Sequence, residues 1–257
     1  MPQLNFLCIG IQKSGTTSLI NYLNSHPQIY MHKHECHFFD TNKNNIISDI
    51  DIKNYEDLFQ TNKLIIGEKT PSYSYLYFAI DRIFDYNKNM KLILILREPI
   101  SRAYSEYNMN AQQNNYEHYE DHMVNEVMRN NDIKLTNINS NGCYYIVRGY
   151  YDEIIKYILG KFSKDQLYIG ISEEIKLNKF EEYNKIYNFL GTYSLNKLDE
   201  KQDTHIRNYN RQMPSKLEKD LYNIYKPHNE KLYEILGRII DLWEQYYIGI
   251  NPLHITS

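Results

Sequence analysis

Residues 10–17 read Gly10-Ile11-Gln12-Lys13-Ser14-Gly15-Thr16-Thr17 and directly follow the apolar run from Leu4 to Ile9. A short apolar run that ends at a glycine is typical of a buried parallel strand. The residues that follow predict a helix from Thr16 to Ser25. A strand, a glycine-containing turn and a helix in this order direct backbone N–H groups and the positive end of a helix toward an anion. The sequence therefore predicts a phosphate-binding loop, to which Ser18 adds a hydroxyl at the start of the helix.

The position of the lysine distinguishes this loop from the ATP-binding motif G-x-x-x-x-G-K-[ST]. Gly10 and Gly15 keep the spacing of that motif, but Thr16 stands where its lysine belongs, and the lysine is at position 13. An ATP enzyme relies on its lysine and on Mg²⁺ to neutralise the β and γ phosphates. This loop carries only half of that apparatus, and an ordinary glycine turn with a capping threonine is the alternative on this motif alone.

The rest of the chain predicts an α/β fold. Apolar runs indicate further buried strands at residues 64–66, 91–96 and 167–171. Helical patterns lie at residues 73–86, 100–113, 116–129, 144–159, 180–190 and 217–243, the last interrupted only around Pro227. Strands that alternate with helices predict a central parallel sheet flanked by helices. We expect a single domain over residues 1–257, with surface loops in the polar stretches 41–54, 130–142 and 194–212.

Composition and charge argue against several classes of protein. A formal net charge of -3 provides no general basic field, so we expect no nucleic acid as a partner. Cys8, Cys36 and Cys143 are odd in number and lack C-x-x-C spacing, which indicates neither a disulfide framework nor a zinc site. No segment reaches the roughly 18 apolar residues of a membrane span, and the N-terminal residues lack a signal-peptide pattern. The expected location is cytoplasmic.

A second anion site is predicted where the strand at 91–96 ends. Arg97 and Glu98 follow the strand, and Pro99 suits the first turn of a helix that contains Ser105. The guanidinium of Arg97 and the hydroxyl of Ser105 can together hold a phosphate. The alternative is an ion pair between Arg97 and Glu98 or another carboxylate.

Together the two elements resemble the 5'-phosphosulfate loop and the 3'-phosphate motif of the sulfotransferases that use 3'-phosphoadenosine 5'-phosphosulfate (PAPS). Two further motifs resemble those of the heparan sulfate and related glycan sulfotransferases. Residues 35–40 (ECHFFD) are similar to E-x-H-F-F-D, and residues 67–73 (GEKTPSY) are similar to G-E-K-[ST]-P-x-Y. Later landmarks follow in order as far as Trp243, so the resemblance covers most of the chain. It implies the sulfotransferase fold, which is related to that of the P-loop kinases.

The resemblance also implies a donor site for PAPS, which would leave as the 3',5'-bisphosphate nucleotide. The residues that would hold it are Lys13, Ser14, Gly15, Thr16, Thr17, Ser18, Arg97 and Ser105. A sulfuryl group bears less charge than a phosphoryl group, so one lysine beside the leaving oxygen can suffice without a metal. We therefore expect no metal, and His32, His34 and His37 lack the spacing of an established ligand set.

Transfer to a hydroxyl requires a base that takes the proton as the oxygen attacks sulfur. By resemblance, Glu35 is this general base, and His37 and Asp40 assist it or orient the acceptor. Lys69 joins Lys13 around the sulfuryl group. Taken singly, a solvated Glu35, a half-buried His37 and a Lys69 at the surface are the alternatives.

The chain departs from the glycan enzymes in the segment that covers the nucleotide. Their cysteine-bracketed K-x-x-G-R-type run is absent, and Arg207 and Arg211 are the cations available there for nucleotide or acceptor binding. The expected function is transfer of a sulfuryl group from PAPS to a hydroxyl or amine of an acceptor, a glycan or a small molecule. A nucleotide or small-molecule kinase and a non-catalytic nucleotide-binding protein of the same fold are the alternatives.

Overall fold

The computed structural model describes residues 3–41, 44–114, 119–129, 133–138, 144–198 and 213–248. The chain forms two compact units, Met1–Leu96 with Tyr157–Thr204 and Arg97–Lys156 with His205–Ser257. The single domain over the whole chain stays a prediction. None of the described helices combines the length and the apolar character that crossing a membrane requires.

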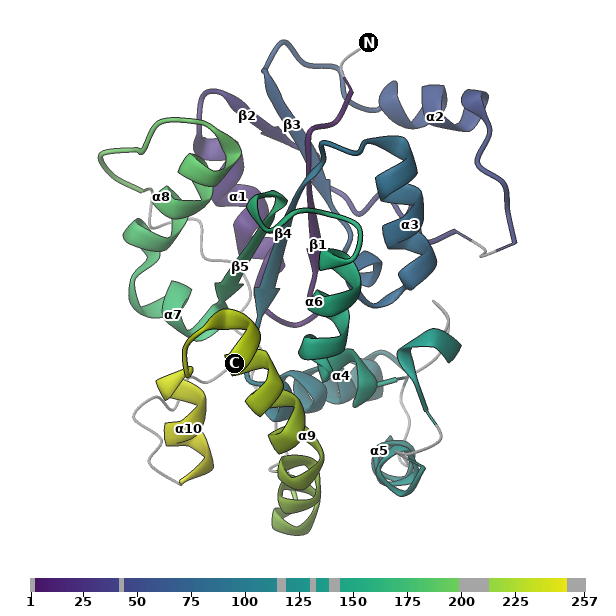
Figure 1. Ribbon diagram of the computed structural model, residues 1–257, viewed down its shortest axis with the longest axis vertical. Helices are drawn as coiled ribbons and strands as arrows, with labels where there is room; N and C mark the ends of the chain where they lie inside the picture. The colour runs from purple at the N-terminus through teal and green to yellow at the C-terminus, as the bar shows by residue number, and fades with distance from the viewer. Residues whose placement is uncertain are drawn as a thin grey trace. The chain divides into compact units, whose positions relative to one another are not determined.

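The first unit is built on a five-stranded parallel sheet with the strand order β2-β3-β1-β4-β5 (Figure 1). Its strands are β1 (Phe6–Gly10), β2 (Ile29–Met31), β3 (Ile65–Lys69), β4 (Lys91–Leu96) and β5 (Leu167–Ile171). The predicted α/β fold with a central parallel sheet is confirmed. The sequence does not predict β2, because three residues are too few for an apolar pattern. It predicts only the start of β3, because the buried charged residues Glu68 and Lys69 interrupt the apolar run.

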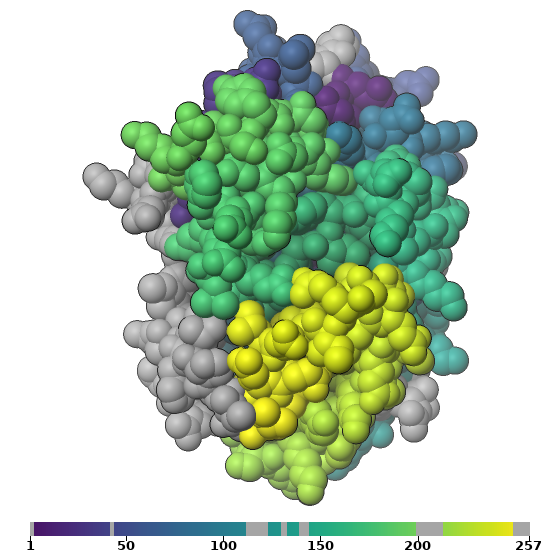
Figure 2. Space-filling model, turned by 60° about the vertical axis from the view of Figure 1, so that its left-hand side comes forward, coloured from purple at the N-terminus to yellow at the C-terminus, as the bar shows by residue number. Residues whose placement is uncertain are grey.

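Helices cover both faces of this sheet. α1 (Thr16–Ser25) and α8 (Lys179–Leu190) lie on one side, and α3 (Tyr77–Tyr86) lies on the other (Figure 1). The outward face of α8, which carries Glu181 and Lys185, forms part of the molecular surface (Figure 2, green). α7 (Ser172–Leu177) and the short 3-10 turn η4 (Lys164–Gln166) flank β5.

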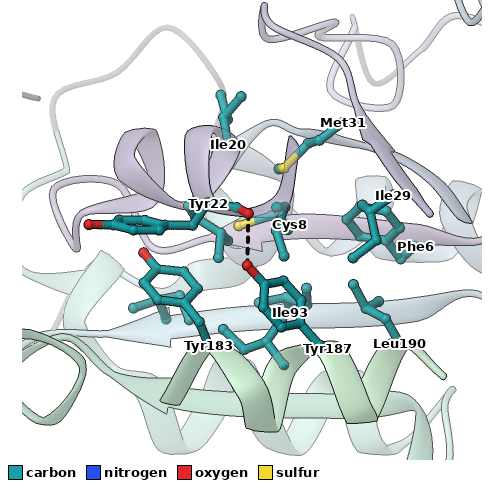
Figure 3. Packing of buried hydrophobic residues seen from close by; sticks show 14 residues of the cluster. Phe6, Cys8, Ile20, Tyr22, Ile29, Met31, Ile93, Tyr183, Tyr187 and Leu190 are labelled. Carbon is teal, nitrogen blue, oxygen red and sulfur yellow. Dashed lines mark hydrogen bonds between the residues drawn. The ribbon is translucent and has the colours of Figure 1, made fainter. Parts of the chain in front are cut away.

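A buried cluster fixes α1 and α8 to the sheet. Phe6 and Cys8 of β1 pack there with residues of both helices (Figure 3). The hydroxyl of Tyr187 in α8 donates to the backbone carbonyl oxygen of Tyr22 in α1 at 2.8 Å, so a polar group in the core is satisfied (Figure 3). Full burial of one large apolar side chain contributes about 2 kcal/mol. This packing sets the position of α1 and therefore of the loop that leads into it.

Two segments of the first unit differ from the sequence-based expectation. The predicted loop at 41–54 contains the start of α2 (Asp49–Glu56), because Ser48 and Asp51 form a capping box that initiates a helix. The predicted helix at 73–86 is divided into the 3-10 turn η1 (Pro71–Tyr75) and α3. Leu76 between them is extended, which ends the first turn before the helix begins.

The second unit consists of helices and turns. They are α4 (Pro99–Asn114), α5 (Tyr119–Met128), η2 (Leu135–Asn137), η3 (Val147–Gly149), α9 (Ser215–Leu236), α10 (Asp241–Tyr247) and the start of α6 (Tyr151–Leu159), which ends in the first unit. A buried ion pair joins Arg102 and Glu106 at 2.6 Å, and Arg148 contacts the other oxygen of the same carboxylate. Removing one partner of such a pair would leave an uncompensated buried charge.

Two predictions about the second unit are wrong. The helix expected at 144–159 begins only at Tyr151, because the Glu126 carboxylate accepts the backbone N–H groups of Tyr145 and Ile146 at 2.7 and 2.8 Å. α9 continues through Pro227 without the expected interruption, and the buried side chains of Tyr225 and Asn229 anchor it on either side. Of the expected loops, residues 130–132, 139–142 and 199–212 lie outside the described part of the chain.

Candidate active site

The predicted phosphate loop begins where β1 ends, at the carboxyl edge of the parallel sheet. The backbone N–H of Ile11 donates to the carbonyl oxygen of Ile95 in β4 at 2.8 Å, which ties the loop to the neighbouring strand. Gly10 has no room for a side chain, because a Cβ atom there would lie 2.4 Å from the Ser74 hydroxyl oxygen. Gly15 has a φ of 83° and is the N-cap of α1. The loop therefore depends on glycine at both positions that keep the motif spacing.

The side chains of the loop fit an anionic ligand. The Ser14 hydroxyl oxygen is buried and has no hydrogen-bond partner among the described residues, a situation that costs about 1–3 kcal/mol unless a ligand relieves it. Gly15 gives α1 no side-chain cap, so the positive end of the helix is left to a ligand. Thr16 is buried, Thr17 is exposed, and Lys13 and Ser18 are half-buried.

Glu35 and Lys69 form an ion pair at the same edge of the sheet. Lys69 ends β3 and pairs in register with Cys8 of β1, two residues before Gly10. Its ammonium nitrogen lies 2.6 Å from Glu35 Oε1, with the lysine side chain 6% exposed and the glutamate side chain 37% exposed. Lys69 is therefore buried rather than at the surface, and the Glu35 carboxylate is accessible to an acceptor.

His37 connects Glu35 to Asp40. Its Nδ1 lies 2.8 Å from Asp40 Oδ2 and its Nε2 lies 3.4 Å from Glu35 Oε2. The Ser72 hydroxyl also donates to Asp40 Oδ2, so the carboxylate that orients the ring is itself held. Burial alone would lower the pKa of His37, but the hydrogen bond and charge of Asp40 and the charge of Glu35 outweigh it and raise the pKa above 6.5. The structure thus brings the side chains of four predicted residues into one continuous series of contacts: Asp40, His37, Glu35 and Lys69.

Two hydroxyl groups hold the backbone that carries Glu35, His37 and Asp40. Thr70 Oγ1 accepts the N–H groups of Cys36 and His37 at 3.2 and 3.4 Å. The hydroxyl oxygen of Tyr73 accepts those of Phe38 and Phe39 at 3.0 and 3.4 Å. The motif GEKTPSY predicts a role for Lys69 by family resemblance, but it predicts none for Thr70 or Tyr73.

The second predicted anion element belongs to the second unit. Arg97 follows β4 directly, and its carbonyl oxygen accepts from the Tyr151 hydroxyl at 2.8 Å. Glu98 serves as the N-cap of α4, where its carboxylate accepts the N–H groups of Ile100 and Ser101 at 2.9 and 2.7 Å. Ser105 lies in α4 and is 3% exposed. The roles of Arg97 and Ser105 stay predictions, and Arg207 and Arg211 lie outside the described residues.

A glycine-containing loop between the first strand of a parallel sheet and the N-terminus of a helix is typical of proteins that bind a nucleotide. The sequence model of the sulfotransferase domain matches residues 4–229, and the chain therefore belongs to the sulfotransferase domain family. It is 42% identical over 110 residues to the membrane-associated sulfotransferase kil1 of Dictyostelium discoideum, covering 42% of this chain and 23% of that protein.

A second similar protein is heparan sulfate glucosamine 3-O-sulfotransferase 5 of Mus musculus, 37% identical over 101 residues that cover 39% of this chain and 29% of that protein. The match thus spans only about a quarter of the length of these relatives. The crystal structure of a sulfotransferase from Alicyclobacillus acidocaldarius aligns with a TM-score of 0.76 at 22% identity, covering 94% of this chain and 98% of that one. This likeness confirms the fold.

Cysteine, histidine and carboxylate side chains could in principle form a metal site. Among the described residues, no three or more of them are arranged to hold a metal ion. The expectation that the reaction needs no metal stays a prediction.

Proposed function

We propose that this chain transfers a sulfuryl group from PAPS to a hydroxyl or amine of an acceptor, with a carbohydrate as the preferred class. The observation that carries the proposal is the Glu35–Lys69 ion pair beside the phosphate loop, in a chain that belongs to the sulfotransferase family. The carbohydrate acceptor is supported by the similarity to a heparan sulfate 3-O-sulfotransferase. Family membership also favours this function over a kinase or a non-catalytic nucleotide-binding protein.

The loop supplies the donor site in this proposal. Lys13 would neutralise charge on the leaving oxygen, while the unpaired Ser14 hydroxyl and the N-terminus of α1 would hold the 5'-phosphosulfate. Arg97 and Ser105 would bind the 3'-phosphate. When bound, PAPS supplies an activated sulfuryl group and leaves as the 3',5'-bisphosphate nucleotide.

Glu35 would act on the acceptor. The ammonium group of Lys69, 2.6 Å from Glu35 Oε1, fixes one oxygen of the carboxylate. His37 Nε2, 3.4 Å from Glu35 Oε2, fixes the second oxygen, and Asp40 fixes the ring through Nδ1. Glu35 would then take the proton of the acceptor hydroxyl as its oxygen attacks sulfur. The cytoplasmic location and the lack of a nucleic-acid partner stay predictions.

Calorimetric titration with adenosine 3',5'-bisphosphate tests the donor site. We expect the wild-type protein to bind it at least about tenfold more tightly than adenosine 5'-phosphate, because Arg97 forms a charge-assisted hydrogen bond with the 3'-phosphate. Arg97→Ala should abolish this difference while leaving the affinity for adenosine 5'-phosphate unchanged, so the second nucleotide serves as the matched control. Absence of bisphosphate binding, or thermal stabilisation by Mg-ATP in its place, would contradict the proposed function.

A further inference from the structure

Glu68 is a fully buried carboxylate beside the candidate base, and the proposed reaction does not use it. It lies in β3, one residue before Lys69, with no exposed surface. Among the residues that the structure describes, no lysine, arginine or histidine forms an ion pair with it. Its carboxylate instead accepts from hydroxyls: Thr70 Oγ1 donates to Oε2 at 2.8 Å, and Tyr55 donates to Oε1 at 3.3 Å.

The Thr70 hydroxyl also holds the backbone of residues 36 and 37. A hydroxyl has one proton to donate and two lone pairs that accept. Thr70 accepts the N–H groups of Cys36 and His37, and it donates its own proton to Glu68. The Glu68 carboxylate therefore fixes the direction of the Thr70 hydroxyl, and with it these two successive N–H groups.

The backbone held in this way carries the groups of the candidate site. Glu35 precedes the segment, His37 lies within it at a φ of 51°, and Asp40 follows it. A left-handed conformation is unfavourable for a residue with a side chain and persists only where the surroundings enforce it. The hydrogen bonds from residues 36 and 37 to Thr70 supply that enforcement.

We propose that Glu68 is a positioning residue, which through Thr70 fixes the backbone of residues 36 and 37 and thereby the carboxylate of Glu35. This inference rests on the proposed function for its effect on turnover. The structural link from Glu68 to residues 36 and 37 stands on its own geometry.

The burial of the Glu68 carboxylate indicates that this residue positions the candidate site and does not stabilise the folded protein. Burial raises the pKa of Glu68 from 4.5 to about 7, although hydrogen bonds from Thr70, Tyr73 and Tyr55 lower it. Above that pH the protein holds a buried carboxylate ion, which disfavours the folded state. The titratable groups that face it are Cys8 of β1, Tyr55 of α2, Tyr73 of η1 and, on the held segment, Cys36, His37 and Asp40.

Glu68→Gln tests the proposal, because the amide keeps the shape but replaces one acceptor oxygen by a donor that competes for a hydroxyl. We expect kcat to fall about 10- to 100-fold through displacement of Glu35, with the bisphosphate dissociation constant changed less than twofold. Amide hydrogen exchange at residues 36 and 37 should become faster, while the melting temperature at pH 8 should stay equal or rise. A residue with a merely structural role would lower the melting temperature and spare kcat.

Glu56→Gln is the matched control, because Glu56 also accepts from a tyrosine hydroxyl, that of Tyr86 at 2.9 Å. It should change neither turnover nor exchange at residues 36 and 37. Thr70→Val leaves the Glu68 charge in place and should release residues 36 and 37, which keeps the test valid if Glu68→Gln does not fold.

Unchanged exchange at residues 36 and 37 in Glu68→Gln and in Thr70→Val would overturn the proposal. A loss of melting temperature and of bisphosphate affinity in parallel with kcat would also overturn it. If the wild-type protein transfers no sulfuryl group, the proposed function fails, whereas the exchange measurement still decides whether Glu68 holds the segment.

Discussion

At the scale of single residues, the candidate site contains ionisable side chains that each contact an oppositely charged or hydrogen-bonding neighbour. His37 lies between the carboxylates of Asp40 and Glu35, at 2.8 and 3.4 Å, although its side chain is 57% exposed. The motif ECHFFD predicts Glu35, His37 and Asp40 by family resemblance, and the structure brings them together. The sequence does not predict a role for Ser72, Thr70 or Glu68. A sequence shows neither that a charged strand residue is buried nor where its hydroxyl partners point.

The His37–Asp40 pair should give the protein a pH dependence. Because the pKa of His37 is raised above 6.5, the pair stabilises the folded state fully below that value and loses its contribution as the pH rises through the raised pKa. Asp40→Asn should move the His37 titration, followed by NMR, to lower pH. Asp81→Asn, which alters a carboxylate that accepts from the Tyr157 hydroxyl, is the control and should leave the titration in place. Identical His37 titrations in wild type and Asp40→Asn would contradict the geometry.

At the scale of elements, strands and helices with strong local patterns were predictable. α1, β4 and β5 match their predicted bounds, because each is a continuous apolar or amphipathic run. The exceptions have tertiary causes: Glu126 delays the start of α6, and packing on either side of Pro227 carries α9 through a residue that normally breaks a helix. The turn between β1 and α1 was also predictable, because Gly10 and Gly15 mark positions where a side chain is unfavourable.

Alanine substitutions at Gly10 and at Gly237 test whether the close approach to Gly10 requires a glycine. Gly10→Ala should lower the free energy of unfolding by about 1–3 kcal/mol, because the new Cβ would meet the Ser74 hydroxyl at 2.4 Å. Gly237→Ala is the matched control: its φ is also positive, at 69°, but a Cβ there meets no atom within 4 Å. Urea denaturation should therefore show a smaller loss for Gly237→Ala. Equal losses would mean that the close approach at Gly10 does not constrain the loop.

At the scale of the whole molecule, the residues proposed for one reaction are divided between two units. The phosphate loop, Glu35 and Lys69 belong to the first unit, and Arg97 and Ser105 to the second. The match to the sulfotransferase domain over residues 4–229 includes parts of both. The motifs of both units are recognisable in the sequence, in the order in which they occur along the chain. The acceptor is not predictable from it, because the shape of the segments around the site decides acceptor choice and no motif encodes that shape.

Transfer of radiolabelled sulfuryl groups from PAPS to a panel of glycans is the most direct test of the account, comparing the wild-type protein with Glu35→Gln. The account predicts labelling of at least one carbohydrate by the wild type and a kcat at least about 100-fold lower for Glu35→Gln, because the general base is lost. The bisphosphate affinity of the two proteins should agree within about twofold, since Glu35 is assigned to the acceptor side. Undiminished turnover by Glu35→Gln, or no labelled acceptor in a wild-type protein that binds PAPS, would contradict it.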